Sequence, residues 1–334
     1  MKISRPTRLL LWPASVLYGL VTATRTTLYA KDWLKRKRLN AAVISVGNLT
    51  VGGTGKTPLV IWLAERLLQQ GKRVAILTRG YRRAAGTSDE VELMKSRLQN
   101  RVAFGVGKDR FTQGQQLESK QAVDVFLLDD GFQHQQLARD LDIVLIDASR
   151  PMGGQALLPA GRMREPVSAM ARANIIVFTR TENAPGAERA IRALSSLPVF
   201  AASTRLLGFR RLTGDDSLIP LTNLGAGPFF VFCGIGNPDA FLRDLQRSGI
   251  PVAGHMFFTD HHRYTLDDVR SIEKAAQQAG ATACITTEKD AWNLTAVKFA
   301  ALPVYVSVIE LEIAEEDSFL YAVSGVIQSH GAIV

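Results

Sequence analysis

The segment from residue 41 to residue 70 constrains the fold of this chain more than any other. Ala41–Gly47 is a continuous apolar run typical of a buried strand, and Pro58–Gln70 has the pattern of a helix. Between them lies the glycine-rich turn GNLTVGGTGKT. A strand that passes through such a turn directly into a helix is the setting of a P-loop. The sequence therefore predicts a phosphate-binding turn in an α/β domain.

The residue types in this turn suit a nucleotide triphosphate. Its glycines let successive backbone N–H groups point inward around phosphate oxygens, and the helix N-terminus adds positive potential. Lys56 is placed to reach the β- and γ-phosphates, and the Thr57 hydroxyl is placed to ligate Mg²⁺. We expect ATP to be bound by Gly52, Gly53, Thr54, Gly55, Lys56 and Thr57.

One position departs from the strict P-loop spacing, because Thr50 stands where the pattern has glycine. A glycine-rich turn that binds no nucleotide is the alternative. The Gly-Lys-Thr triplet at a strand–helix junction favours the nucleotide site.

A second apolar strand ends in two carboxylates. Val125–Leu128 leads into Asp129, Asp130 and the sequence GFQH. An acid at this place beside a P-loop holds Mg²⁺ directly or through water. Neighbouring residues of a strand point to opposite faces, so one acid is expected to face the metal and the other a helix or the substrate. The sequence contains no Asn-Lys-x-Asp motif for guanine, which Glu288-Lys289-Asp290 resembles only loosely, so ATP is the expected nucleotide.

Strands and helices alternate over the rest of the chain. Continuous apolar runs at Arg73–Thr78, Ile143–Ile146 and Ile175–Thr179 suit a parallel sheet covered on both faces. We predict a doubly wound α/β domain of the P-loop type over residues 39–203. Residues 204–228, with a Gly-Asp-Asp turn, are predicted to be a linker that can contain a hairpin, and residues 229–334 a second, smaller α/β domain. The two cysteines, Cys233 and Cys284, are expected to be reduced core thiols.

The first 38 residues carry most of the net charge. They hold nine Lys and Arg against one Asp, which is +8 of the chain's +9. A general affinity for nucleic acid would spread cations over the fold, so this asymmetry argues against nucleic acid as a partner.

An uncharged run, Leu9–Thr24, lies inside this basic segment, and its 16 residues fall short of the roughly 20 that span a bilayer. Leu10, Leu17, Val21 and Leu28 share one helical face. We expect residues 1–38 to form a membrane-association segment whose helix lies in the cytoplasmic leaflet, held by its cations. A helix packed on its own domain is the alternative.

Several further stretches resemble the tetraacyldisaccharide 4′-kinase family of Gram-negative bacteria. They occur in the family's order and cover most of the chain: LYGLV, ISVGNLTVGGTGKTP, LTRGYRR, DDGFQHQQLARDLDIVLID, LLPAGRMREP, CGIGNP, FTDHHRYT and TTEKDA. The resemblance implies an enzyme that moves the γ-phosphate of ATP, with Mg²⁺, to the 4′-hydroxyl of a tetraacylated glucosamine disaccharide 1-phosphate. The product would be lipid IV-A, in lipid A biosynthesis. It also implies a cytoplasmic enzyme, peripheral on the inner membrane, with no obligate protein partner.

The resemblance also assigns acid–base residues. The family's base is an Asp in a Gly-Asp-Glu-Pro stretch, and its partner is a His in an Asp-His pair of the second domain. The base role falls to Asp89 in Ser88-Asp89-Glu90-Val91, where the Gly and Pro are missing, and the partner role falls to His261. Because these residues lie in different predicted domains, their meeting would require domain closure. Glu165 in RMREP resembles a family acid near Mg²⁺.

A membrane-targeted P-loop ATPase or GTPase switch is the competing function, and a nucleotide-binding scaffold without catalysis is a third. A switch needs loops that sense the γ-phosphate, and none can be identified in the sequence. The second α/β domain with its Asp-His pair favours the kinase.

Overall fold

The computed structural model describes residues 5–80, 88–149, 151, 156–184, 196–215, 217–294 and 297–331. The chain divides into two compact units. The first unit contains Met1–Tyr81, Arg97–Ser203 and Leu311–Val334, and the second contains Arg82–Ser96 and Thr204–Glu310. Both are α/β with mostly parallel strands, which confirms the predicted fold class.

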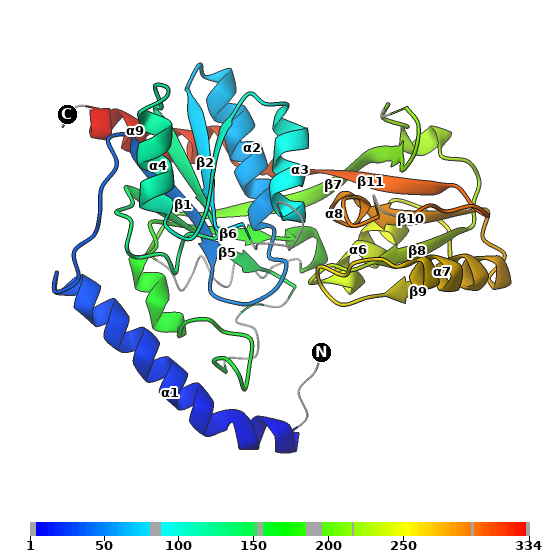
Figure 1. The fold of residues 1–334 in the computed structure, drawn as a ribbon, viewed down its shortest axis with the longest axis horizontal. Helices are drawn as coiled ribbons and strands as arrows, with labels where there is room; N and C mark the ends of the chain where they lie inside the picture. Colours follow the sequence, from blue (N-terminus) through cyan, green and yellow to red (C-terminus); the bar gives the residue numbers. More distant parts are fainter. Residues whose placement is uncertain are drawn as a thin grey trace. The chain divides into compact units, whose positions relative to one another are not determined.

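The first unit is built on a parallel sheet with the strand order β3-β2-β4-β1-β5-β6-β7 (Figure 1). Its strands are β1 (Ala42–Asn48), β2 (Val74–Thr78), β3 (Ala103–Val106), β4 (Val125–Asp129), β5 (Leu141–Asp147), β6 (Ile175–Thr179) and β7 (Val199–Arg211). Every residue of β1, β2, β4, β5 and β6 is buried, as continuous apolar runs require. The sheet places the ends of β1 and β4 side by side.

Helices cover both faces of this sheet. The first unit contains α1 (Arg5–Ala30), α2 (Lys56–Gln69), α4 (Arg110–Glu118), α9 (Glu316–Gly331) and the 3₁₀ helices η2 (Val167–Arg172) and η3 (Thr181–Asn183). Val199 packs on one face with a cluster that Met170 of η2 covers. The next residue, Phe200, points to the other face and meets Phe319 of α9 edge to face, 5.2 Å between ring centres. Phe319 also contacts Trp62 of α2.

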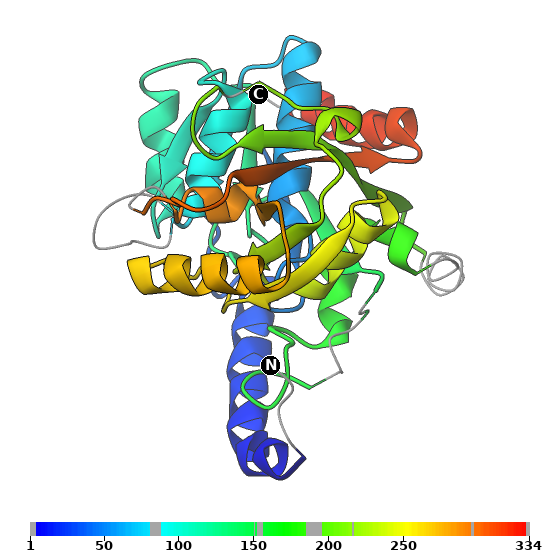
Figure 2. The same ribbon diagram turned by 90° about the vertical axis from the view of Figure 1, so that its right-hand side faces the viewer.

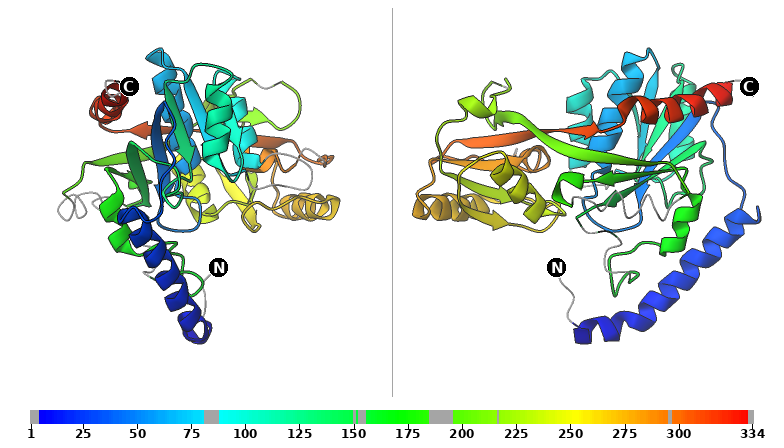
Figure 3. Two further views of the ribbon diagram at one scale, coloured as in Figure 1. Left: turned by 60° about the vertical axis from the view of Figure 1, so that its left-hand side comes forward. Right: turned by 180° about the vertical axis from the view of Figure 1, so that it is seen from behind.

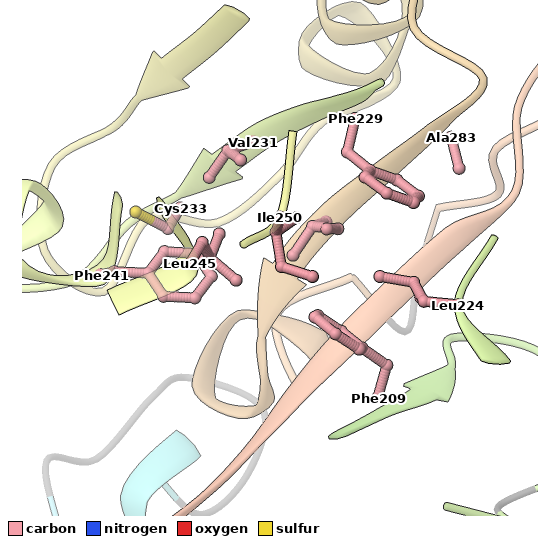
Figure 4. Packing of buried hydrophobic residues seen from close by; sticks show 10 residues of the cluster. Phe209, Leu224, Phe229, Val231, Cys233, Phe241, Leu245, Ile250 and Ala283 are labelled. Atoms are coloured by element: carbon pink, nitrogen blue, oxygen red, sulfur yellow. The ribbon is translucent and has the colours of Figure 1, made fainter. Parts of the chain in front are cut away.

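The second unit has a smaller parallel sheet in the order β11-β10-β8-β9. Its elements are β8 (Phe229–Cys233), β9 (Val252–Phe257), β10 (Ala283–Thr287), β11 (Val304–Ile313), α6 (Pro238–Arg247), α7 (Leu266–Gln278), α8 (Glu288–Ala291) and η4 (Leu221–Asn223), with most of α3 (Asp89–Leu98). Phe209, Phe229 and Phe241 anchor the core on one face (Figure 4). Cys233 and Cys284 are buried and free, as expected of core thiols.

The residue bounds of the two units differ from the predicted domain bounds in three places. β7 continues without a break to Arg211, so residues 204–211 are strand and not linker. The antiparallel pairing expected near here is present, because Phe209 and Ile219 exchange two backbone hydrogen bonds of 2.9 and 2.7 Å. Residues 311–334 belong to the first unit and residues 82–96 to the second. Apolar periodicity shows which side of a helix is buried, but it does not show which core buries it.

The amino-terminal helix α1 extends away from the sheet of the first unit (Figures 2 and 3) and contacts the segment of that unit around residues 157–164. Ser15 is buried, and its Oγ donates to the Leu157 carbonyl at 3.0 Å and accepts from the Ala160 N–H at 2.9 Å. The Tyr18 hydroxyl donates to the Arg164 carbonyl at 2.9 Å. In the described part of the chain, no helix has the length and apolar character needed to cross a membrane. One face of α1 is therefore packed on its own unit, as the alternative required.

Candidate functional site

The glycine-rich turn has the backbone geometry of an anion-binding loop. β1 ends at Asn48 and α2 begins at Lys56. Gly52 has φ 117° and Gly55, the residue that caps α2, has φ 88°. Both values lie in the left-handed region that glycine adopts without steric cost. The sequence thus places glycine where the turn reverses into the helix, as a P-loop requires.

Thr54 is fixed at the centre of the turn by its neighbours. Its side chain is buried, and its Oγ accepts a hydrogen bond of 2.7 Å from the Asn48 amide. The Thr179 hydroxyl at the end of β6 donates to the Thr54 carbonyl at 2.8 Å. The loop is thereby tied to two strands of the sheet, which preorganises it before any phosphate binds.

A neighbouring segment explains why residue 50 is not glycine. Thr50 forms an antiparallel bridge with Met163, and the Val51 N–H donates to the Arg162 carbonyl at 2.8 Å. The Arg162 guanidinium donates back to the Val51 carbonyl at 2.9 Å. Residue 50 is therefore in a short extended pairing, which a β-branched residue favours. Through this hydrogen bond to the Val51 carbonyl, Arg162 restricts the movement of the loop.

Lys56 is oriented by Asn48 and Asp130. Its Nζ lies 3.3 Å from the Asn48 amide oxygen and 3.5 Å from an Asp130 oxygen. Arg164 contacts both oxygens of Asp130, at 2.8 and 2.7 Å. Burial raises the pKa of Asp130, but Lys56 and Arg164 outweigh it and hold that pKa below its usual value. Asp130 is therefore an ionised carboxylate beside the lysine of the glycine-rich turn.

The two adjacent acids have different surroundings. Asp129 is buried at the end of β4 and accepts a hydrogen bond of 3.2 Å from the Thr78 hydroxyl of β2. Asp130 has φ 51°, which turns its side chain toward Lys56. The sequence left open which of the two acids contacts which neighbour. In the structure Asp130 contacts Lys56, and Asp129 contacts Thr78.

Hard oxygen donors for a divalent cation are present at this turn in Thr57, Asp129 and Asp130, as Mg²⁺ chemistry requires. Glu165, the fourth predicted ligand, is buried and bound to Arg172 at 2.6 Å. Arg172 in turn lies 4.4 Å over the Phe132 ring. Within the described residues, no three His, Cys, Asp or Glu side chains form a preassembled metal cluster.

Asp89 and His261 are in contact within the second unit. The His261 Nδ1 lies 3.1 Å from each Asp89 oxygen, and Asp89 is only 2% exposed. The Asn293 amide also donates to Asp89, at 3.4 Å. The bond to Asp89 raises the pKa of His261, while burial and Lys289 act against it. A carboxylate ordered by an imidazole is the arrangement of a general base and its orienting partner.

This contact corrects the expected need for domain closure. Asp89 belongs to Arg82–Ser96, which is part of the same unit as His261. The two side chains therefore meet inside one folded unit, and no movement of domains is required to pair them. The sequence-based boundary failed because residues 82–96 leave the first unit between β2 and β3.

A buried network holds the backbone of His261. His261 has φ 61°, and its N–H donates to the Gly234 carbonyl at 3.0 Å. The Gly234 N–H donates to Asp290 at 2.8 Å, and the Tyr264 hydroxyl donates to the same oxygen at 2.9 Å. A Cβ on residue 234 would lie 2.9 Å from His262, so glycine is needed there. Asp290 thus fixes the turn that carries the imidazole.

Lys289 completes the surroundings of the imidazole. Its Nζ lies 3.4 Å from the His261 Nε2 and 3.0 Å from an Asp260 oxygen. His262, the second member of the His pair, instead contacts Asp268 at 3.0 Å and stacks on Phe258. In the sequence, Lys289 and Asp290 belong to a loose match to a guanine motif and to the TTEKDA stretch that resembles the kinase family, and neither assigns them a role beside His261. Their distance of about 30 residues from His261 along the chain hid the contact.

Known proteins resemble the chain over nearly its whole length. The model of the family described as tetraacyldisaccharide-1-P 4′-kinase matches residues 7–328. The tetraacyldisaccharide 4′-kinase of Geobacter metallireducens is 38% identical over 319 residues, which cover 90% of this chain and 93% of that protein. The protein of the same name from Geobacter sulfurreducens is 38% identical over 315 residues, covering 89% and 87%.

A solved structure adds a match in three dimensions. LpxK from Aquifex aeolicus, crystallised in complex with ATP, is 31% identical to the chain with a TM-score of 0.76. The match covers 96% of this chain and 99% of that one.

Proposed function

The chain belongs to the tetraacyldisaccharide-1-P 4′-kinase family, and from that premise we propose that it transfers the γ-phosphate of ATP to the 4′-hydroxyl of a tetraacylated glucosamine disaccharide 1-phosphate. The product is lipid IV-A, an intermediate of lipid A biosynthesis. The enzyme is a phosphotransferase with an alcohol as acceptor. The observation that carries the proposal is the Asp89–His261 contact in a chain that also contains a P-loop.

The P-loop binds the nucleotide in this proposal. Backbone N–H groups of residues 52–57 surround the phosphates, and the N-terminus of α2 adds positive potential. Lys56 neutralises charge on the β- and γ-phosphates, and Asp130 and Asn48 aim it. A bound Mg²⁺ would neutralise further phosphate charge, and its ligands would be Thr57, Asp129 and Asp130. Glu165 would be a fourth ligand, whose charge is also used in the ion pair with Arg172.

Asp89 acts as the general base. One carboxylate oxygen accepts the proton of the 4′-hydroxyl while the hydroxyl oxygen forms its bond to the γ-phosphorus. The bond from that phosphorus to the β,γ-bridging oxygen breaks, and ADP leaves with the electron pair. His261 donates through Nδ1 to Asp89 and so keeps the carboxylate oriented and ionised.

Helix α1 places the enzyme at the inner membrane, where a substrate with four acyl chains lies. Away from the buried Ser15 and Tyr29, α1 carries large apolar side chains in water: Leu9, Leu10, Trp12, Val16, Leu17, Leu20 and Val21, each 42% to 81% exposed. A contiguous exposed apolar face of this kind marks an interaction surface. With the basic residues that follow the helix, it suits the anionic cytoplasmic leaflet.

The partition of labelled phosphate tests the proposal. The protein is incubated with γ-labelled ATP, Mg²⁺ and the detergent-dispersed disaccharide 1-phosphate. We expect label in the lipid fraction. Label released only as free phosphate, independent of the lipid, would support the membrane-targeted ATPase switch and refute the kinase.

A further inference from the structure

Lys289 contacts the imidazole on the side away from Asp89. Its Nζ lies 3.4 Å from the His261 Nε2, 3.0 Å from an Asp260 oxygen and 3.6 Å from a Glu90 oxygen. The first two are hydrogen-bond contacts of the ammonium group, and the third is an ion pair. The lysine side chain is 18% exposed, whereas the His261 and Asp260 side chains are 39% and 35% exposed.

The charges around His261 pull its protonation in opposite directions. The described charged groups within 4 Å of its two ring nitrogens are the carboxylates of Asp89, Glu90 and Asp260 and the ammonium of Lys289. Glu90 and Asp89 come from α3, Asp260 from the loop after β9, and Lys289 from α8. The three acids favour a doubly protonated imidazolium, and the lysine opposes it.

An imidazolium would direct its Nε2–H at a cation. A neutral ring with its proton on Nδ1 avoids this, because Nδ1–H donates to Asp89 while the Nε2 lone pair accepts from Lys289. We propose that Lys289 is a positioning residue that favours the neutral His261 ring with its proton on Nδ1 over the imidazolium, so that the ring orients the base without taking up its proton. The inference rests on the proposed function, in which Asp89 accepts the proton of the 4′-hydroxyl.

The pKa of His261 is raised above its usual value, so Lys289 limits the rise that the bond to Asp89 causes and does not cancel it. The bond to Asp89 raises the pKa of His261, and Lys289 lowers it. Burial lowers the pKa of Lys289, but Glu90 and Asp260 outweigh it and hold the pKa above its usual value, so the lysine stays charged over the neutral range. Removing the lysine charge leaves three carboxylates facing the ring. The pKa of His261 should then rise.

The pKa of His261 can be measured without any turnover. Histidine ring ¹⁵N resonances of the full chain are titrated by NMR in the wild type and in Lys289→Met, with His261→Gln to identify the signal among five histidines. We expect the pKa to rise by about one unit in Lys289→Met, and the wild-type neutral ring to carry its proton on Nδ1. Lys289→Arg, which keeps the charge, and Lys274→Met, which removes an exposed lysine of α7, should leave the pKa unchanged.

The outcomes separate this inference from the proposed function. An unchanged His261 pKa in Lys289→Met, or a proton on Nε2 in the wild type, overturns the role of Lys289 whether or not the protein phosphorylates lipid. If Lys289→Met does not fold, Lys289→Gln replaces it.

The acid limb of kcat/KM against pH is measured on the same variants. We expect it to move to higher pH in Lys289→Met and to stay in place in Lys289→Arg. A shifted NMR pKa with an unmoved acid limb would show that the lysine does not serve the reaction. A wild type that phosphorylates no lipid refutes the kinase and leaves the NMR result standing.

Discussion

The protonation of His261, which contacts the candidate base Asp89, contributes to the stability of the second unit. Its pKa is raised in the folded protein, chiefly by the bond to Asp89. A folded-state pKa above the unfolded value gives stability that is fully present below about pH 6.5 and is lost as pH rises through the folded pKa. We predict that the difference in unfolding free energy between wild type and His261→Gln is largest at acid pH and shrinks above neutrality. Urea denaturation across this pH range measures it, and a difference that grows with pH would contradict the Asp89 contact.

Asp290, in contrast to the candidate base Asp89, is a carboxylate whose role is structural. It is fully buried and receives the Gly234 N–H, the Tyr264 hydroxyl and the Thr287 hydroxyl. We predict that Asp290→Ala lowers the unfolding free energy by about 2–4 kcal/mol, because buried donors lose their acceptor. Asp267→Ala, at an exposed site on α7, should change it by less than about 0.5 kcal/mol. Equal effects in the two variants would refute the network.

Part of the candidate site could be predicted from the sequence, residue by residue. The P-loop residues and the candidate pair Asp89 and His261 were identified because their motifs are local or match a family pattern. The Arg164–Asp130 pair and the contact of Lys289 with His261 were missed. Each joins residues from distant parts of the chain, and nothing in one sequence couples their positions.

At the scale of elements, strands were predicted best where burial is complete. β6 was predicted with its observed bounds, and β1, β2 and β4 within two residues at each end. β3 was missed although its four residues are apolar, because so short a run with a glycine in it does not by itself distinguish a strand from other structure. The last helix was predicted, but its unit was wrong, since the pattern of α9 is equally compatible with either core.

The placement of α9 gives a prediction about that helix. Phe319 is fully buried between Trp62 and Phe200, whereas Tyr321 two residues later is 83% exposed. Phe319→Ala should lower the unfolding free energy of the first unit by about 3–5 kcal/mol, and Tyr321→Ala by less than about 0.5 kcal/mol. Hydrogen exchange at the backbone amides of α2 and α9, measured against urea concentration, reports on this unit. A small effect of Phe319→Ala would place α9 outside the core of the first unit.

At the scale of the whole molecule, we propose that the exposed apolar face of α1 and the basic segment after it together bind the anionic membrane surface. We predict that Leu17→Glu with Leu20→Glu abolishes sedimentation with anionic phospholipid vesicles, because two charges enter the apolar face. Tyr321→Glu, also an exposed apolar position, is the control and should sediment as the wild type does. Raising the salt concentration should weaken binding, since the cations contribute electrostatically. Undiminished sedimentation of the double variant would refute the membrane role of this face.

The proposed reaction joins a P-loop and a preformed Asp–His pair in one phosphotransfer. Its most direct test is turnover of γ-labelled ATP and the disaccharide 1-phosphate by Asp89→Asn, with ATP affinity measured by calorimetry on the same preparation. We predict that lipid phosphorylation falls by about 10²–10⁴-fold while ATP affinity stays at the wild-type value, since the base touches the acceptor and not the nucleotide. Lipid phosphorylation at the wild-type rate in Asp89→Asn would contradict the account.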